Sequence, residues 1–177
     1  MIISISGSVG TGKTSFAKIL KKKLNKKEKF KFTYKKFKII HLNDWAIDYK
    51  IEDVKKLQTF DFDIDKLIVK INTYLSENKS QNLIIEGHFA HFIDPKLVDY
   101  LFILNRDIKE LEIEYMKRKY NIKKRNDNLE VENFNLCFYE GIEEGYRQEE
   151  QIFCIENNKK LTELADQIIL KIYQKKS

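Results

Sequence analysis

Three of the six glycines in this 177-residue chain fall within eight residues near the N-terminus, in the segment Gly7–Thr14, which reads GSVGTGKT. The apolar run Ile2–Ile5 stands directly before this segment. A glycine-rich stretch that ends in Gly-Lys-Thr after a strand is typical of a phosphate-binding loop. Its backbone N–H groups surround a polyphosphate, Lys13 reaches the β and γ phosphates, and the Thr14 hydroxyl ligates Mg²⁺. We therefore expect the chain to bind a nucleoside triphosphate.

The residues after the loop have the pattern of an amphipathic helix. Apolar side chains in Thr14–Leu24 recur at helical spacing, from Phe16 to Leu24. The positive end of this helix would point at the phosphates. A glycine-rich turn with an incidental lysine is the alternative, and it does not account for the strand before the loop or the helix after it.

The rest of the chain alternates short apolar runs with amphipathic segments, which is typical of a parallel sheet covered by helices on both faces. The expected strands are Ile2–Ser6, Phe37–Leu42, Leu83–Glu86, Tyr100–Leu104 and Gln151–Ile155. The expected helices are Thr14–Leu24, Ile64–Asn78, Ile108–Lys119, about Glu130–Gln148, and a last one from Leu161 to Ile172. At 177 residues this predicts one α/β domain, a three-layer P-loop NTPase fold with a five-stranded parallel sheet.

Two segments lack a clean pattern, Asn43–Asp63 and Tyr120–Asn128. Irregular segments near the carboxyl ends of parallel strands commonly bind substrate, so both are interpreted as substrate-binding flaps.

The net charge of +6 is concentrated in one place, because Lys18–Lys38 contains eleven lysines and a single acid, Glu28. We interpret this patch as a solvated helix end and loop. The alternative is a surface that contacts RNA. The aromatic residues in it indicate a hairpin or strand as readily as a base-stacking surface.

The composition favours a cytoplasmic protein with no membrane partner, because no run approaches the roughly 20 apolar residues that span a bilayer. Cys137 and Cys154 are too few and too widely spaced for a disulfide framework or a metal site. Both lie in apolar runs and are interpreted as small core residues.

A second element of a nucleotide site is expected at the end of a buried strand, where an acid acts on Mg²⁺ through water. The run Leu83–Glu86 fits, and His88 follows close behind, near the γ phosphate. An ordinary carboxylate at a strand end and a loop histidine are the alternatives. His41 and His91 have no comparable context.

Cations are needed where negative charge spreads over a transferred phosphoryl group. Arg118 and Arg125 flank a basic segment, so one mobile flap is expected to deliver several cations and exclude water. Solvated charges at an exposed helix end are the alternative.

Four motifs together resemble the adenylate kinase isoenzyme 6 family, over nearly the whole chain and in its archaeal form. They are Gly7–Thr14, the strand end Ile85-Glu86-Gly87-His88, the strand Leu101–Leu104 with Arg106 and Asp107 after it, and Lys117–Lys124 with Asp127 and Asn128 downstream. Shikimate kinase and other small phosphotransferases share only the first.

This resemblance implies transfer of phosphate from ATP to AMP or a related nucleoside monophosphate (NMP), with Mg²⁺-dependent ATPase activity. It also implies a role in small ribosomal subunit maturation and binding of a ribosomal protein of the small-subunit platform. Carried over by position, residues 43–66 form the NMP-binding region and about 117–127 the lid. The residues implied to hold ATP are Gly10, Gly12, Lys13, Thr14, Ser15 and Arg118.

The chain departs from the family in three places. The lysine-rich stretch after the first helix is longer, and Lys119 stands where the family commonly has glycine. The NMP-binding region has no arginine and offers only Lys50, Lys55, Lys56 and Lys66. A lysine is a point charge rather than a bidentate fork.

Three functions are therefore weighed. The leading one is an NMP kinase. The second is an ATP-driven ribosome-assembly switch with incidental kinase activity, which the missing arginine and the lysine patch favour. The third is a small-metabolite kinase of shikimate type, which explains the loop but not the residues from Glu86 to His88 and from Arg118 to Lys124.

Overall fold

The computed structural model describes residues 1–26, 36–55, 59–157 and 160–174, and its centre is a parallel sheet. The strand order is β2-β5-β1-β6-β7, and every neighbouring pair is parallel. The bounds are β1 Ile2–Ser6, β2 Phe37–His41, β5 Asn82–Glu86, β6 Tyr100–Asn105 and β7 Ile152–Glu156. The predicted α/β fold is confirmed, with strand ends within one residue of the expected ones.

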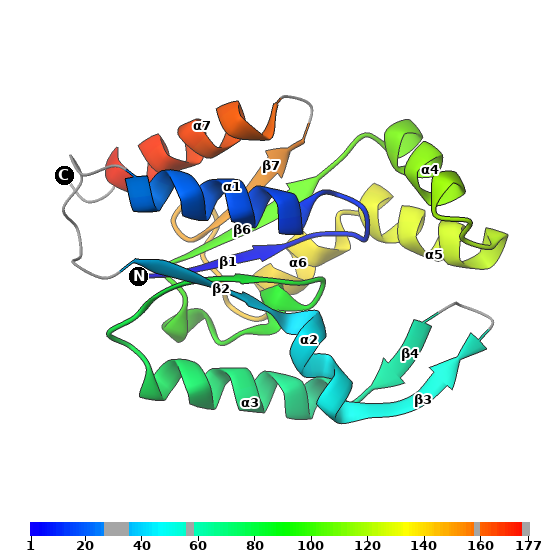
Figure 1. The fold of residues 1–177 in the computed structure, drawn as a ribbon, viewed down its shortest axis with the longest axis horizontal. Helices are drawn as coiled ribbons and strands as arrows, with labels where there is room; N and C mark the ends of the chain where they lie inside the picture. Colours follow the sequence, from blue (N-terminus) through cyan, green and yellow to red (C-terminus); the bar gives the residue numbers. More distant parts are fainter. Residues whose placement is uncertain (27–35, 56–58, 158–159, 175–177) are drawn as a thin grey trace.

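Helices cover both faces of this sheet (Figure 1). One face carries α1 Lys13–Lys26 and α7 Leu161–Gln174, and the other carries α3 Ile64–Glu77 and α6 Leu136–Glu143. Phe16 of α1 and Ile168 of α7 pack in one core cluster, whereas Ile71 of α3 and Cys137 of α6 pack in the other. Two apolar layers therefore pack against β1 from both faces of the sheet. The loop that follows β1 starts from this fixed strand.

The described residues of the segment 43–63, which was expected to be irregular, form regular elements. It contains α2 Leu42–Ala46, the 3-10 turn η1 Ile47–Tyr49, and the antiparallel strands β3 Lys50–Val54 and β4 Thr59–Phe62. In Figure 1 this hairpin projects from the sheet on the same side as α4 Ile108–Lys117 and α5 Ile122–Asn133. The residues of β3 are mostly exposed, and the alternation of polar and aromatic residues in β4 extends over only four positions.

The expectation of one helix over about 130–148 is wrong. Two helices, α5 and α6, meet at Asn135, which adopts a left-handed backbone with φ 51° that no continuous helix allows. The expected irregular segment Tyr120–Asn128 is helical from Ile122 onward, because the Asn121 side chain accepts a hydrogen bond from Lys124 N and caps the start of α5.

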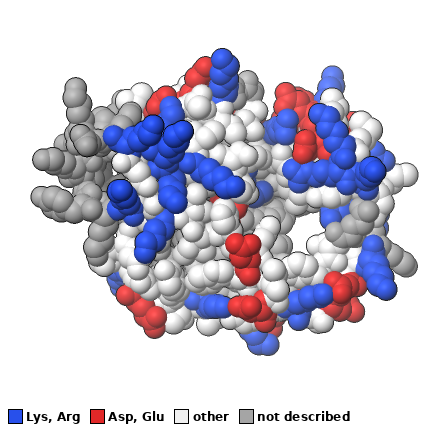
Figure 2. Space-filling view, viewed as in Figure 1, with Lys and Arg blue, Asp and Glu red and all other residues white. Residues whose placement is uncertain are grey.

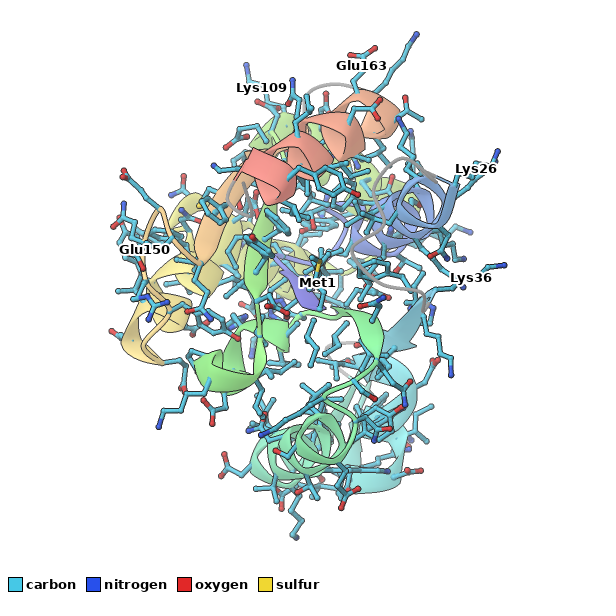
Figure 3. All side chains as sticks on the ribbon, turned by 90° about the vertical axis from the view of Figure 1, so that its left-hand side faces the viewer. Met1, Lys26, Lys36, Lys109, Glu150 and Glu163 are labelled. Carbon is cyan, nitrogen blue, oxygen red and sulfur yellow. The ribbon has the colours of Figure 1, made fainter. Side chains whose placement is uncertain are left out.

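The lysine patch lies only partly within the described residues. Several of its lysines lie on α1 and β2. Lys26, the last residue of α1, and Lys36, just before β2, point outward at one edge of the molecule (Figure 3). Residues 27–35, which include Glu28 and most of its aromatic residues, lie outside the described part.

Two further expectations can be compared with the structure. Cys137 is buried as expected, but Cys154 is exposed because β7 is an edge strand. Among the described residues, no helix is both long and apolar enough to cross a lipid bilayer.

Candidate active site

The glycine-rich loop leaves the carboxyl end of β1 and turns sharply into α1. Gly7 has a φ of 136°, and a side chain there would bring its Cβ to 2.3 Å from the backbone oxygen of Leu104. The position therefore requires glycine, because any other residue would collide with the backbone of β6.

The Lys13 ammonium lies inside the loop. Its Nζ donates to the backbone oxygens of Gly7 and Ser8, at 2.8 and 2.7 Å. Burial lowers the pKa of Lys13 to about 8. The loop thus holds its cation close to the backbone N–H groups, where a phosphate would bind.

Glu86 stands at the carboxyl end of β5 and is 7% exposed. Thr14 Oγ1 donates to Glu86 Oε1 at 3.0 Å, and His41 Nδ1 lies 2.5 Å from the same oxygen. A hydroxyl and a carboxylate are oxygen donors of the kind that Mg²⁺ prefers, so this pair fits the ion.

His41 is a site residue that sequence analysis passed over. It is the last residue of β2, in register with Glu86 at the end of the neighbouring β5. The signal that could have found it is its place at a strand end, since β2 and β5 are far apart in the chain and adjacent in the sheet.

His88 follows Glu86 and reaches back to the loop. Its Nδ1 lies 3.0 Å from the backbone oxygen of Gly7, and because a carbonyl only accepts, Nδ1 carries the proton. Burial lowers the pKa of His88, so the ring is neutral near pH 7 and its Nε2 is an acceptor.

One cavity of about 220 Å³ collects Lys13, Thr14, Glu86 and His88, whereas His41 is not among its lining residues. Arg118 reaches it from the end of α4, and its Nε donates to Glu114 Oε1 at 2.8 Å. Arg125, the other arginine of the expected flap, is not among the cavity residues. The lining is formed by Val9, Gly10, Gly12, Lys13, Thr14, Ser15, Asn43, Glu86, Gly87, His88 and Arg118.

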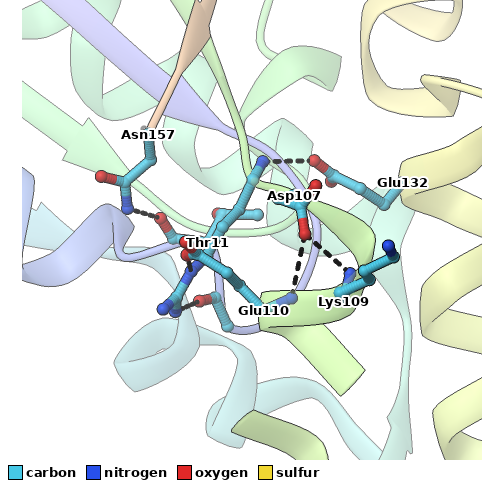
Figure 4. A network of polar contacts seen from close by, with 8 residues as sticks. Thr11, Asp107, Lys109, Glu110, Glu132 and Asn157 are labelled. Carbon is cyan, nitrogen blue, oxygen red and sulfur yellow. Dashed lines mark hydrogen bonds and ion pairs between the residues drawn. The ribbon is translucent and has the colours of Figure 1, made fainter. Parts of the chain in front are cut away.

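Distant segments hold the outer side of the loop (Figure 4). Asn157, just after β7, donates from Nδ2 to Thr11 O at 2.8 Å. Arg106 donates from Nη1 to Gly10 O at 3.2 Å, and its backbone N donates to Glu132 Oε1 at 2.6 Å. Contacts across such sequence separations have no local pattern, and sequence analysis assigned no role to Asn157 or Glu132.

The lysines between 43 and 66 are arranged differently. Lys50 forms an ion pair with Asp53 at 2.7 Å, and Lys66 forms one with Asp63 at 2.9 Å. Lys55 is exposed, and Lys56 lies outside the described residues. The hairpin is joined to the loop of His88 by an aromatic contact, with the rings of Phe62 and Phe89 5.2 Å apart.

The chain is similar to a known protein family and to named archaeal proteins. The model of the AAA domain family matches residues 3–135. A protein of Methanocaldococcus jannaschii named "Putative adenylate kinase" is 28% identical over 177 residues, which cover 99% of this chain and 88% of the relative. A protein of the same name from Methanosarcina acetivorans is 30% identical over 149 residues, covering 81% and 72%.

Solved structures agree on the fold alone. A gluconokinase from Sinorhizobium meliloti superposes with a TM-score of 0.59 at 12% identity and covers 97% of this chain and 91% of that one. The family match spans β1, the loop, Glu86 and α5, so it includes most of the cavity described above. The chain therefore belongs to the AAA domain family, and within it to the group of archaeal proteins named "Putative adenylate kinase".

Proposed function

We propose that this protein is an NMP kinase that transfers the γ-phosphate of ATP to AMP or a related monophosphate, and that it hydrolyses ATP as a second activity. One observation carries the proposal: the loop lysine, Glu86 and Arg118 line a single cavity. In Figure 2 the molecular surface is hollowed between the β3–β4 hairpin and the α4–α5 pair. The name shared by the archaeal relatives supports the same activity.

In this proposal the donor nucleotide is held by Gly10, Gly12, Lys13, Thr14 and Ser15, with Arg118 on its phosphates. Mg²⁺ would be held by Thr14 directly and by Glu86 through water, and when bound it neutralises charge on the phosphate oxygens. His41 would orient the Glu86 carboxylate through the 2.5 Å contact.

The acceptor would bind in residues 43–66, with residues 117–127 acting as the lid. A monophosphate is already an anionic nucleophile, so transfer needs in-line placement and charge neutralisation rather than a general base. Water is a weaker nucleophile and has to be oriented. We therefore assign Glu86 and His88 a larger part in hydrolysis than in transfer.

Two assays test this division. Diphosphate formation from Mg-ATP and a panel of monophosphates, with gluconate and shikimate as controls, should show turnover only with a monophosphate. His88→Ala should lower hydrolysis by ~10²-fold or more and transfer by less. Equal losses in both reactions would contradict the division, and the absence of diphosphate with every monophosphate would contradict the kinase.

Two observations favour a second function. Residues 43–66 contain no arginine, and Lys50 and Lys66 are already paired with Asp53 and Asp63. This alternative is an ATP-driven switch that binds a ribosomal protein of the small-subunit platform, or pre-ribosomal RNA, in the cytoplasm. Hydrolysis that begins only when such a partner is added would support the switch. Rapid diphosphate formation without any partner would exclude it as the sole function.

A further inference from the structure

A second group of chemically reactive side chains lies behind the phosphate-binding loop and has no part in the proposed phosphate transfer. His91 belongs to the 3-10 turn η3 Ala90–Phe92, and Cys137 and Glu140 belong to α6. One nitrogen, one sulfur and one carboxylate oxygen from these residues lie within 4.8 Å of one another. His91 and Cys137 are buried, whereas the Glu140 side chain is 40% exposed.

The hydrogen bonds around His91 leave two acceptor atoms facing each other. Ser6 Oγ has one proton and lies 2.8 Å from the backbone oxygen of His88, which can only accept. Ser6 Oγ therefore accepts from His91 Nδ1, 2.7 Å away. In the neutral ring Nε2 then has a lone pair, and it faces Glu140 Oε2 at 2.9 Å. Two acceptors this close require a proton or a cation between them.

The position of Cys137 distinguishes a metal ion from a proton. Cys137 and Glu140 are three residues apart on one helix, so their side chains lie on the same face and converge on His91. A shared proton needs only the imidazole and the carboxylate. A thiol beside both of them completes a nitrogen, sulfur and oxygen donor set, which suits Zn²⁺ and related divalent metals.

We propose that His91 Nε2, Cys137 Sγ and Glu140 Oε2 form a zinc site, with water as a fourth ligand. Binding would break the S–H bond of Cys137, form a Zn–S bond and release the proton to solvent, together with any proton shared by His91 and Glu140. Ser6 would be a positioning residue, because it accepts from Nδ1 and fixes Nε2 as the ligand atom. This inference does not depend on the proposed kinase activity.

The site would connect α6 to the carboxyl end of β1. Ser6 is the last residue of β1, directly before Gly7, and it also holds the backbone of His88. A metal bound here would stabilise the support of the phosphate-binding loop without contacting the nucleotide. The expected signature is a rise in thermal stability with zinc, since the metal binds only the folded arrangement.

Cobalt titration of the tag-free, metal-stripped full chain tests the site. Co²⁺ should bind in a 1:1 ratio and give near-ultraviolet charge-transfer absorption from the thiolate, which one equivalent of Zn²⁺ abolishes. A thiol that is not bound to cobalt gives no such band, because the band requires a Co–S bond. The Thr14 and Glu86 oxygens cannot produce this charge-transfer band either, because they offer cobalt no sulfur ligand.

The two cysteines provide a matched pair of variants. Cys137→Ser should abolish the band, and Cys154→Ser, on the exposed edge strand, should keep it. Glu140→Gln, at a half-exposed position that does not threaten folding, should weaken Co²⁺ binding by ~10-fold or more, and Ser6→Ala by ~10–100-fold. No thiolate band in the wild type, or a band that survives Cys137→Ser in folded protein, would overturn the proposal in favour of a shared proton.

Discussion

The two halves of the cavity region are built in opposite ways. On the proposed donor side, Lys13 is the first residue of α1 and Glu86 is the last residue of β5, and the side chain of each makes two polar contacts. On the acceptor side, Lys50 and Lys66 lie on or beside an exposed hairpin and pair with their own neighbours Asp53 and Asp63. In the proposed function, the donor half would be organised before a ligand arrives, whereas the acceptor half would have to exchange existing ion pairs for a phosphate.

This difference has an energetic consequence. A buried cation without a counterion lies in a low dielectric, where a phosphate gains a strong interaction. An exposed ion pair is worth only ~0.2–1 kcal/mol, and a phosphate that replaces the acid gains a similar amount. We therefore expect strong, specific binding of the triphosphate and weaker binding of the monophosphate.

The largest effect is expected for Lys13→Ala, which removes the cation of the donor half. The rate of diphosphate formation should fall by ~10²–10³-fold, because charge on the transferred phosphoryl group loses its buried partner. Lys66→Ala is the matched loss on the acceptor side and should raise KM for the monophosphate by a few-fold only. If Lys13→Ala and Lys66→Ala reduced diphosphate formation by similar factors, the expected difference between the donor and acceptor halves would be contradicted.

The pH dependence of nucleotide binding follows from the same lysine. Since the pKa of Lys13 is lowered to about 8, the amine loses its proton above that pH, and the Kd for ADP should rise toward ~10-fold per pH unit. The stability of the unliganded protein should change the other way and increase as pH rises from about 8 toward 10.5, because the unfolded chain retains the proton longer.

Isothermal titration calorimetry at a series of pH values measures the first effect and chemical denaturation the second. A Kd for ADP that stays constant well above pH 8 in folded protein would mean that Lys13 keeps its proton in the free loop.

On the acceptor side, Asp63→Asn should release Lys66 without unfolding α3. Asp63 caps that helix through Lys66 N at 3.0 Å, and asparagine caps equally well. The freed ammonium should lower KM for the monophosphate by ~2–5-fold, the equivalent of one exposed ion pair. Asp166→Asn, which breaks the pair with Lys23 far from the cavity, is the control and should leave KM unchanged. A higher KM in Asp63→Asn would show that the pair itself serves the acceptor.

The smallest effect concerns the hinge between α4 and α5. Lys119 has φ 56°, its N–H donates to Met116 O, and Tyr120 N donates to Tyr115 O, which together form the helix-ending motif that favours glycine. Lys119→Gly should raise the free energy of unfolding by ~0.5–1 kcal/mol, as relief of backbone strain exceeds the entropy cost of glycine.

Denaturant titration measures the change, and Lys119→Ala, which keeps a Cβ, should show no gain. A loss of stability in Lys119→Gly would mean that side-chain contacts of Lys119 outweigh the strain.

Sequence patterns located the elements of the proposed donor half, because each element is local. The strand before Gly7, the motif ending at Thr14 and the acid that closes β5 are each contiguous in the chain. His41 could not be assigned from its own neighbours, since its contact with Glu86 depends on β2 lying beside β5. The pairing of strands is a property of the whole sheet.

The acceptor side was predicted less well for a related reason. The β3–β4 hairpin buries little apolar surface, and the alternation in Thr59–Phe62 extends over only four residues, so the segment appeared irregular in the sequence. The break at Asn135 was missed because the apolar spacing continues across it from α5 into α6. A left-handed residue changes the direction of a helix without changing the hydrophobic pattern.

If the two halves form one phosphate-transfer site, a bisubstrate analogue should bind to both of them at once. In such a compound a polyphosphate chain joins two adenosines, so it can occupy the donor and acceptor halves together. We predict one analogue per chain, with a Kd at least ~10-fold lower than that of ATP under the same conditions, because the second half adds contacts without a second loss of translational freedom. A Kd no lower than that of ATP would contradict a single phosphate-transfer site.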